Sequence, residues 1–183
     1  MIDDTRTHTD PHPSRTTSPG RRVALLGTLA ALALVLGYVE MLVPLPGAPM
    51  GVKLGLGNMV VLFALTRFDA RTALSLMIVK VAGSALLFGN PQVFAFSLAG
   101  GLMSWAVMAL AVRSGAFSCV GTSVLGGVSH DAGQLIMVAL LLSPQVALVN
   151  IPLLAVAGVV SGLVVGALTQ ALLNAIKPEA IHG

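Results

Sequence analysis

The chain has very few charged residues for its length. Of its 183 residues, only 9% are Asp, Glu, Lys or Arg, whereas 56% are hydrophobic. Soluble domains carry about 25% charged residues, so a chain this poor in charge cannot cover a water-facing surface of its own. The composition therefore excludes an ordinary soluble globular protein and predicts that lipid is the solvent for much of the chain.

Cysteine and aromatic residues are also scarce. Cys119 is the only cysteine, which excludes an internal disulfide framework and a metal site built from several cysteines. Aromatic residues make up 4% of the chain, too few for a surface that stacks on nucleic-acid bases. The net charge is +3, and we interpret the basic residues as determinants of membrane topology. Nucleic acid is therefore not an expected partner, and no cofactor is expected.

The first twenty residues differ from everything that follows them. Residues 1–20 are polar, rich in Thr, Ser and Pro, and lack an apolar face, which predicts a disordered cytoplasmic tail. Residues 21–177 form the predicted transmembrane domain, and residues 178–183 form a second short cytoplasmic tail.

Six apolar segments follow the tail. A spanning helix needs about 17–25 apolar residues, and all the segments but the second are long enough. The second is short for a span, and the stretch before it contains three prolines, which predict a loop. The expected fold is therefore an all-α integral membrane protein with six transmembrane helices. The segments cover approximately residues 22–43, 51–67, 71–88, 92–112, 117–142 and 147–176.

Arginine and lysine residues occur in alternate loops. Cytoplasmic loops collect Lys and Arg, so six spans with both termini in the cytoplasm place all of these charges correctly. We therefore predict a multi-pass protein of a bacterial cell membrane, with outer loops near 44–53, 89–92 and 143–147. The basic residues that set this topology are Arg21, Arg22, Arg67, Arg71, Arg113 and Lys177.

Small residues recur at a spacing of four in two of the segments. Gly158, Gly162 and Gly166 form a double GxxxG pattern in the last segment, which lets another helix backbone approach closely. Gly27 and Ala31 form a similar stripe in the first segment. Internal helix packing explains either stripe. The sharper hypothesis is that Gly27 and Ala31 dock a partner subunit.

Several polar residues lie within the apolar segments or in the predicted outer loops. Ionisable groups inside a membrane are costly and are usually paired or functional. With the predicted topology, these residues all lie in the outer half of the membrane or outside it, which predicts a polar cavity that opens outward. The candidate substrate-binding residues are Glu40, Lys53, Asn58, Lys80, Asn90, His130, Asp131 and Gln134.

The charges nearest the membrane centre are Lys80 and Asp131. Lys80 lies about 13 Å into its segment at 1.5 Å per residue, and Asp131 lies at a similar depth, so we expect them to approach each other beside His130. A structural ion pair is one interpretation, and ligand contacts are the other. His130 is equally consistent with a hydrogen-bonded packing residue, and Glu40 and Lys53 with interfacial positions.

Four motifs resemble those of one known family. They are GVKLGLGN at 51–58, ALLFGN at 85–90, SLAGGLMS at 97–104 and LGGVSHDAGQL at 125–135. In order and spacing, over residues 24–175, they are similar to the Gx transporter family, also described as heptaprenyl diphosphate synthase component I. The resemblance implies a bundle like the six-helix S components of energy-coupling factor transporters, which bind substrates. The chain departs from the family pattern at Asp131, where Asn is expected, and at Lys80, where Arg is expected.

The cavity and the resemblance together predict a membrane subunit that captures a small polar molecule from outside for uptake. The chain has no GxxxxGK[ST] motif, so an ATP-driven step requires partner subunits, namely an ATPase pair and a coupling membrane protein. The alternative is that the protein works alone, moving its ligand down a gradient. A cavity with Lys, His, Asp and Glu suits a polar or zwitterionic compound.

The second functional hypothesis is a membrane component of heptaprenyl diphosphate synthase. Soluble prenyl synthases hold magnesium and diphosphate with clustered carboxylates. The only adjacent acidic pair here is Asp3 and Asp4, in the predicted tail. We therefore expect the chain itself not to be an enzyme, so that any role in prenyl synthesis is accessory.

Overall fold

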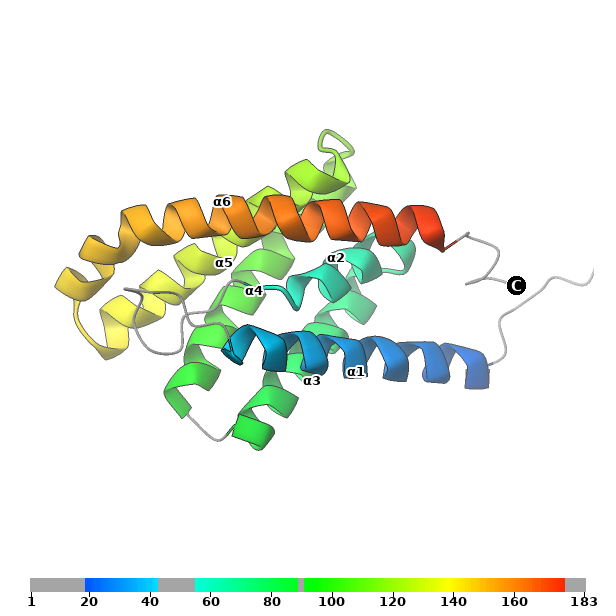
Figure 1. Cartoon of the computed structure of the whole chain (residues 1–183), viewed down its shortest axis with the longest axis horizontal. Coiled ribbons are helices and arrows are strands. Elements are labelled where there is room, and N and C mark those ends of the chain that lie inside the picture. The colour runs from blue at the N-terminus through cyan, green and yellow to red at the C-terminus, as the bar shows by residue number, and fades with distance from the viewer. Residues whose placement is uncertain (1–18, 43–54, 89–90, 177–183) are drawn as a thin grey trace, which may run out of the picture.

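The computed structural model describes residues 19–42, 55–88 and 91–176. These residues form α-helices joined by short connections and contain no strand, which confirms the predicted all-α fold class. The predicted tails lie largely outside the described residues. The helices are α1 (Pro19–Leu42), α2 (Asn58–Arg67), α3 (Ala70–Phe88), α4 (Pro91–Ser114), α5 (Cys119–Leu141) and α6 (Pro144–Ala175), as shown in Figure 1.

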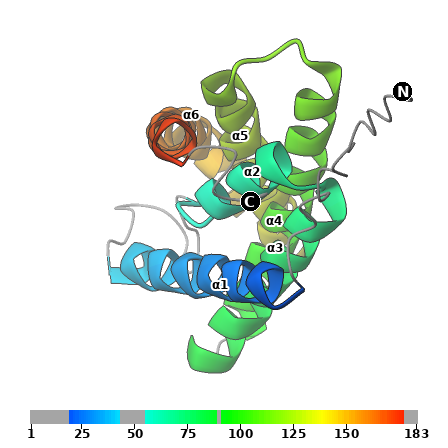
Figure 2. The same ribbon diagram turned by 90° about the vertical axis from the view of Figure 1, so that its right-hand side faces the viewer.

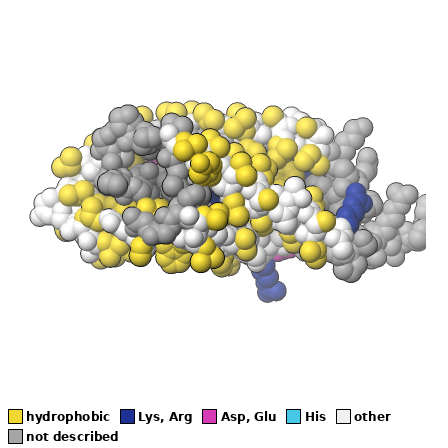
Figure 3. All heavy atoms as spheres, turned by 60° about the horizontal axis from the view of Figure 1, so that its bottom comes forward, with side chains coloured by type: hydrophobic (Ala, Val, Ile, Leu, Met, Phe, Trp, Pro, Cys, Tyr) yellow, Lys and Arg dark blue, Asp and Glu magenta, His cyan; other side chains and the backbone are white. Residues whose placement is uncertain are grey.

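Five of the helices are long and apolar enough to cross a membrane, namely α1, α3, α4, α5 and α6. Many of their outward side chains are apolar; Leu86 and Val149, for example, are 87% and 79% exposed. Hydrophobic side chains also cover much of the face shown in Figure 3. Large aliphatic side chains exposed along whole helices are stable in lipid rather than in water. The chain is therefore a multi-pass membrane protein.

The second predicted segment is shorter than expected. Helix α2 begins at Asn58 and has 10 residues, which is about 15 Å of helix, or half of a hydrocarbon core about 30 Å thick. The prediction of a helix from residue 51 is wrong for residues 55–57, which form a turn; residues 51–54 lie outside the described part. Gly55 has a φ of +81°, a conformation that glycine adopts readily and that cannot continue a helix.

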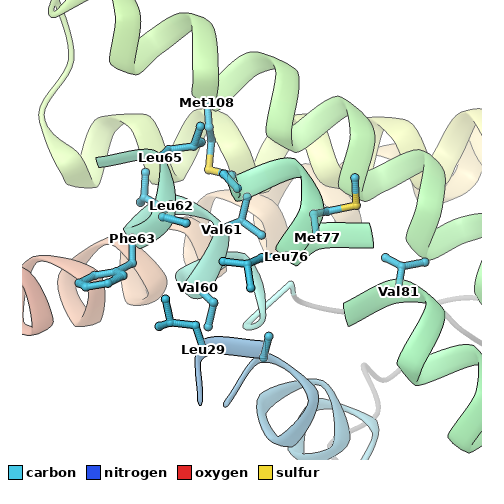
Figure 4. Packing of buried hydrophobic residues seen from close by; sticks show 13 residues of the cluster. Leu29, Val60, Val61, Leu62, Phe63, Leu65, Leu76, Met77, Val81 and Met108 are labelled. Atoms are coloured by element: carbon cyan, nitrogen blue, oxygen red, sulfur yellow. The ribbon is translucent and has the colours of Figure 1, made fainter. Parts of the chain in front are cut away.

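Helix α2 lies at the centre of the bundle and packs against each of the other five helices. The six residues from Val60 to Leu65 are each at most 7% exposed, so the helix is buried on every side. Figure 4 shows their side chains among those of α1, α3 and α4, including Leu29, Met77 and Met108. The surrounding helices therefore hold α2, and the turn before it, inside the protein.

Glycines join α5 closely to α6. A Cβ atom on Gly162 would lie 2.6 Å from the Cα of Val124, and one on Gly127 would lie 2.3 Å from the carbonyl oxygen of Gly158. Gly166 meets the Cα of Val120 in the same way, at 2.7 Å. The small-residue stripe of the last segment therefore serves internal packing. Because α5 covers this face of α6, a partner subunit cannot bind there.

Both ends of the described chain lie at one end of the bundle. Helix α1 begins and α6 ends at the right of Figure 1. Figure 2 looks onto that end and shows α1 and α6 apart from each other, with α2 between them. This arrangement agrees with termini on the same side of the membrane, as the alternating basic loops predict.

Arg67 links the end of α2 to the end of α6 through hydrogen bonds. Its Nη2 atom donates hydrogen bonds to the carbonyl oxygens of Leu173 and Ile176, at 2.7 and 3.1 Å. Carbonyls in the last turn of a helix have no partner within the helix, so the guanidinium supplies one. This contact fixes the basic end of the bundle.

Arg67→Met is expected to lower the free energy of unfolding in mild detergent by about 1–3 kcal/mol, because it leaves these carbonyls unsatisfied. Arg71→Met is the matched control, since Arg71 is exposed near the same end and should change stability by less than about 0.5 kcal/mol. Equal losses in the two variants would contradict a specific role for Arg67.

Candidate ligand-binding site

The candidate site begins at the turn that precedes α2. The Glu40 carboxylate, at the end of α1, accepts a hydrogen bond from the backbone N–H of Gly55 and another from that of Leu56, the second at 3.3 Å. Glu40 is 4% exposed. A buried carboxylate from one helix therefore holds the chain at the point where α2 starts.

Lys80 reaches the same point from α3. Its Nζ atom donates to Oδ1 of Asn58 at 3.5 Å, and Nδ2 of Asn58 donates to Oγ of Ser104 on α4 at 3.2 Å. A Cβ atom on Gly57 would lie 2.6 Å from Nζ of Lys80. Glycine at 57 therefore lets the ammonium approach the beginning of α2, and Asn58 links it to α4.

His130 and Gln134 contribute one further hydrogen bond from α5. Their Nε2 atoms lie 2.8 Å apart, as expected for residues four apart on one helical face. A Cβ atom on Gly100 of α4 would lie 3.0 Å from both the Gln134 Cγ and the His130 Cε1. Gln134 is 0% exposed, and its Oε1 has no hydrogen-bond partner among the described residues, so a buried acceptor is left without a donor there.

Glu40, Lys80 and His130 line one small cavity. They come from α1, α3 and α5, so three helices bring a carboxylate, an ammonium and an imidazole to a single place. Ser84 and Ser97 add hydroxyl groups to its wall. In this state the cavity has room for about one water molecule.

The polar groups lie at similar depths within the bundle. Measured along each helix at 1.5 Å per residue, Asn58 lies about 14 Å from Arg67, and Lys80 about 15 Å from the start of α3. His130 lies about 17 Å from the start of α5 by the same measure. All three therefore lie about half the thickness of a roughly 30 Å hydrocarbon core from the basic end of the bundle, and polar groups inside membrane-spanning segments are usually functional or paired.

The expected approach of Asp131 to Lys80 is not found. The Asp131 carboxylate faces α6, because a Cβ atom on Gly158 would lie 2.7 Å from its Oδ2 atom. That Oδ2 atom has no hydrogen-bond partner among the described residues. The reason is helical geometry. Successive residues project about 100° apart, so His130 can face the Lys80 cavity only if its neighbour Asp131 faces elsewhere.

The remaining predicted residues are not part of this cluster. Lys53 and Asn90 lie outside the described residues. Gly27 and Ala31 are exposed on α1, and a Cβ atom on Gly27 would meet no atom within 4 Å. Helix α1 therefore presents a small-residue face that no other described helix covers.

Sequence reasoning did not single out Ser104, Ser97 or Gly57 as functional residues. Ser97 and Ser104 begin and end the motif SLAGGLMS, and Gly57 lies in GVKLGLGN. Both motifs were recognised, but a serine or glycine in an apolar segment gives no sign of which neighbour it contacts. The motifs themselves were the only signal that could have identified these positions.

The chemistry available at the site is hydrogen bonding and charge pairing. Among the residues that the structure describes, no group of three or more His, Cys, Asp or Glu side chains could hold a metal ion. The site offers a cationic donor at Lys80, a carboxylate at Glu40, and amide and imidazole groups at Gln134 and His130. This set is complementary to groups of both charges, and a ligand larger than a water molecule would require the cavity to widen.

Comparison with known proteins places the chain in a family. No curated protein and no solved structure matches it. The family model described as heptaprenyl diphosphate synthase component I matches residues 29–172, which is more than half of the chain and includes every described residue of the site. The chain therefore belongs to the heptaprenyl diphosphate synthase component I family.

Proposed function

We propose that this chain is a membrane subunit that captures a small polar molecule from outside the cell for uptake. The observation that carries the proposal is the cavity lined by Glu40, Lys80 and His130 near the middle of a membrane-spanning bundle. Ionisable groups are unfavourable in a low-dielectric site and are usually functional or paired there. Binding of a polar ligand is a function that accounts for their presence. The presence of both an ammonium and a carboxylate favours a zwitterionic ligand.

The position at which α2 begins supports this proposal. Helix α2 begins within the bundle, after a turn held by Glu40. In many transporters, half-helices end near the midplane and present their termini to the substrate. The N-terminus of α2 carries a partial positive charge, and the Glu40 carboxylate, which accepts from the backbone N–H groups of the preceding turn, supplies a negative charge beside it.

Uptake would require partner subunits if ATP drives it, because the chain has no nucleotide-binding motif. The exposed Gly27 and Ala31 face of α1 is suited to a coupling membrane protein, since small residues allow close helix approach. The ATPase pair would then act through that partner.

Replacing both Gly27 and Ala31 with Leu is expected to abolish uptake while leaving ligand binding to the isolated chain within about twofold of the original. Both positions are exposed, so the added side chains obstruct a partner and not the fold. Uptake in whole cells and binding to purified protein measure the two effects. Loss of expression and binding together would instead show that this face packs within the chain.

The topology is part of the same proposal. In a chain whose Cys119 is replaced by Ala, an impermeant thiol reagent added outside should label a Cys at Asn90 and leave a Cys at Ser114 unlabelled. Ser114 ends α4 beside Arg113, and basic ends face the cytoplasm. Labelling only at Ser114 would mean that the chain has the opposite orientation in the membrane. The site would then not face the outside of the cell.

The family description favours a second candidate, an accessory role beside a heptaprenyl diphosphate synthase. We propose that the chain itself is not the catalyst. Among the described residues, no group of three or more His, Cys, Asp or Glu side chains could hold a metal ion, whereas a magnesium diphosphate site needs clustered carboxylates. Purified chain incubated with prenyl diphosphates and Mg²⁺ should give no chain elongation. Stimulation of an added soluble synthase, without small-molecule binding, would favour the accessory role over uptake.

A further inference from the structure

An apolar groove lies away from the candidate site, near the basic end of α4. Its volume is about 440 Å³, within the range of about 300–1,000 Å³ that ligand pockets occupy. None of its residues lines the central cavity. The groove is formed by Leu65, Ala70, Trp105, Ala106, Ala109, Leu110, Val112 and Arg113.

Trp105 forms a fixed wall of this groove. Its indole Nε1–H donates a hydrogen bond to the carbonyl oxygen of Ala70 at 2.9 Å, which joins α4 to the start of α3 and fixes the orientation of the ring. From Trp105 to Arg113 the groove follows about 12 Å of α4 at 1.5 Å per residue. The wall along this length is aliphatic, and Leu110 is 69% exposed.

A single cation stands at the end of the groove. Arg113 lies in the last turn of α4 and is exposed. Its side chain makes no hydrogen bond or ion pair with any described residue. The groove therefore combines a long apolar wall with an available guanidinium at the depth where the helix leaves the hydrocarbon core. This pattern is complementary to an amphiphile with an apolar tail and an anionic head.

We propose that the groove binds an anionic phospholipid of the cytoplasmic leaflet. One acyl chain lies along the apolar wall beside Trp105, and the phosphate accepts charge-assisted hydrogen bonds from Arg113. Basic pockets between helices on the cytoplasmic side of a membrane bind anionic headgroups, and the predicted topology puts Arg113 on that side. The inference is independent of the ligand of the central site.

The chain contains a single tryptophan, Trp105, so its fluorescence reports directly on the groove. The full chain is reconstituted in phosphatidylcholine vesicles with increasing fractions of phosphatidylglycerol, with bromine on the acyl chains of one lipid or of the other. Bromine quenches tryptophan on contact. One basic residue near the membrane surface contributes about 1 kcal/mol to the binding of anionic lipid, which is about a fivefold preference. Wild-type protein should therefore show a quenching preference of about fivefold for phosphatidylglycerol over phosphatidylcholine.

Arg113→Gln should reduce this preference to about one, whereas Arg71→Gln, at another exposed arginine outside the groove, should leave it unchanged. Equal quenching by the two lipids in wild-type protein would overturn the proposal, whether or not the variants fold. So would quenching by neither lipid, which would mean that lipid does not enter the groove. If Arg71→Gln removes the preference as fully as Arg113→Gln, surface charge is the cause and the groove is not a site.

Discussion

Gly162→Leu is expected to abolish the stable protein. A Cβ atom at this position would lie 2.6 Å from the Cα of Val124 and 2.9 Å from the carbonyl oxygen of Ser123. Both are backbone atoms of α5, so the clash cannot be relieved by rotating a side chain. The two helices must separate where their glycines meet, and we expect the free energy of unfolding to fall by about 3 kcal/mol.

The matched control is Gly27→Leu, because a Cβ atom on Gly27 meets no atom within 4 Å. The control should be recovered at wild-type yield, whereas Gly162→Leu should not survive purification in mild detergent. Yield and the elution profile in size-exclusion chromatography measure the difference. Equal recovery of the two variants would contradict the close contact of α5 with α6.

Glu40→Ala should produce the largest effect among single changes at the site. The carboxylate accepts hydrogen bonds from the backbone N–H groups of Gly55 and Leu56. An unsatisfied buried donor costs about 1–3 kcal/mol, so losing the acceptor of two donors should lower the free energy of unfolding by about 2–6 kcal/mol. The turn before α2 should lose its anchor, and Lys80 should lose the only described carboxylate that lines its cavity.

Glu40→Gln separates the two roles of this side chain. Glutamine keeps one oxygen that can accept both N–H groups, so the stability that these hydrogen bonds contribute should return. The deficit that remains is the cost of leaving the buried Lys80 ammonium without its carboxylate. The negative charge beside Lys80 does not return, so binding of a zwitterionic ligand should stay impaired. Unfolding free energies for the two variants provide the measurement. Equal destabilisation by Ala and Gln would mean that hydrogen bonding to the turn is not what Glu40 contributes.

The helices could be predicted because they depend on local composition. Long apolar runs, each with Arg or Lys near one end, determine where α3, α4, α5 and α6 lie, since both helix formation and insertion follow from the segment's own residues. The start of α2 was predicted too early. Lys53, Gly55 and Gly57 interrupt the apolar pattern before Asn58, but glycine is also frequent inside membrane helices, so the sequence alone did not decide where the helix begins. Only the positive φ of Gly55, which depends on its surroundings, shows that the helix does not extend through this turn.

The similar levels of Lys80 and His130 along their helices could be predicted, but direction around the helix axis could not. Counting residues placed Lys80 and His130 at similar levels, and both line one cavity. The same counting paired Lys80 with Asp131, yet α3 and α5 do not pack against each other, and Asp131 faces Gly158 of α6. Which side of a helix faces which neighbour depends on tertiary packing, and six apolar helices leave little amphipathic pattern from which to read it.

The most direct test of the central claim is ligand capture by the purified chain. Wild-type protein, Lys80→Met and Arg71→Met are incubated in detergent with the small-molecule fraction of a bacterial extract, and the retained compounds are identified by mass spectrometry. We predict that wild-type protein and Arg71→Met retain a polar compound with charged groups of both signs. Lys80→Met, which loses the buried ammonium beside Asn58, should retain at least tenfold less, because charged hydrogen bonds contribute about 1.5–3 kcal/mol. Retention of the same compounds by all three proteins, or of none by wild-type protein, would contradict the account.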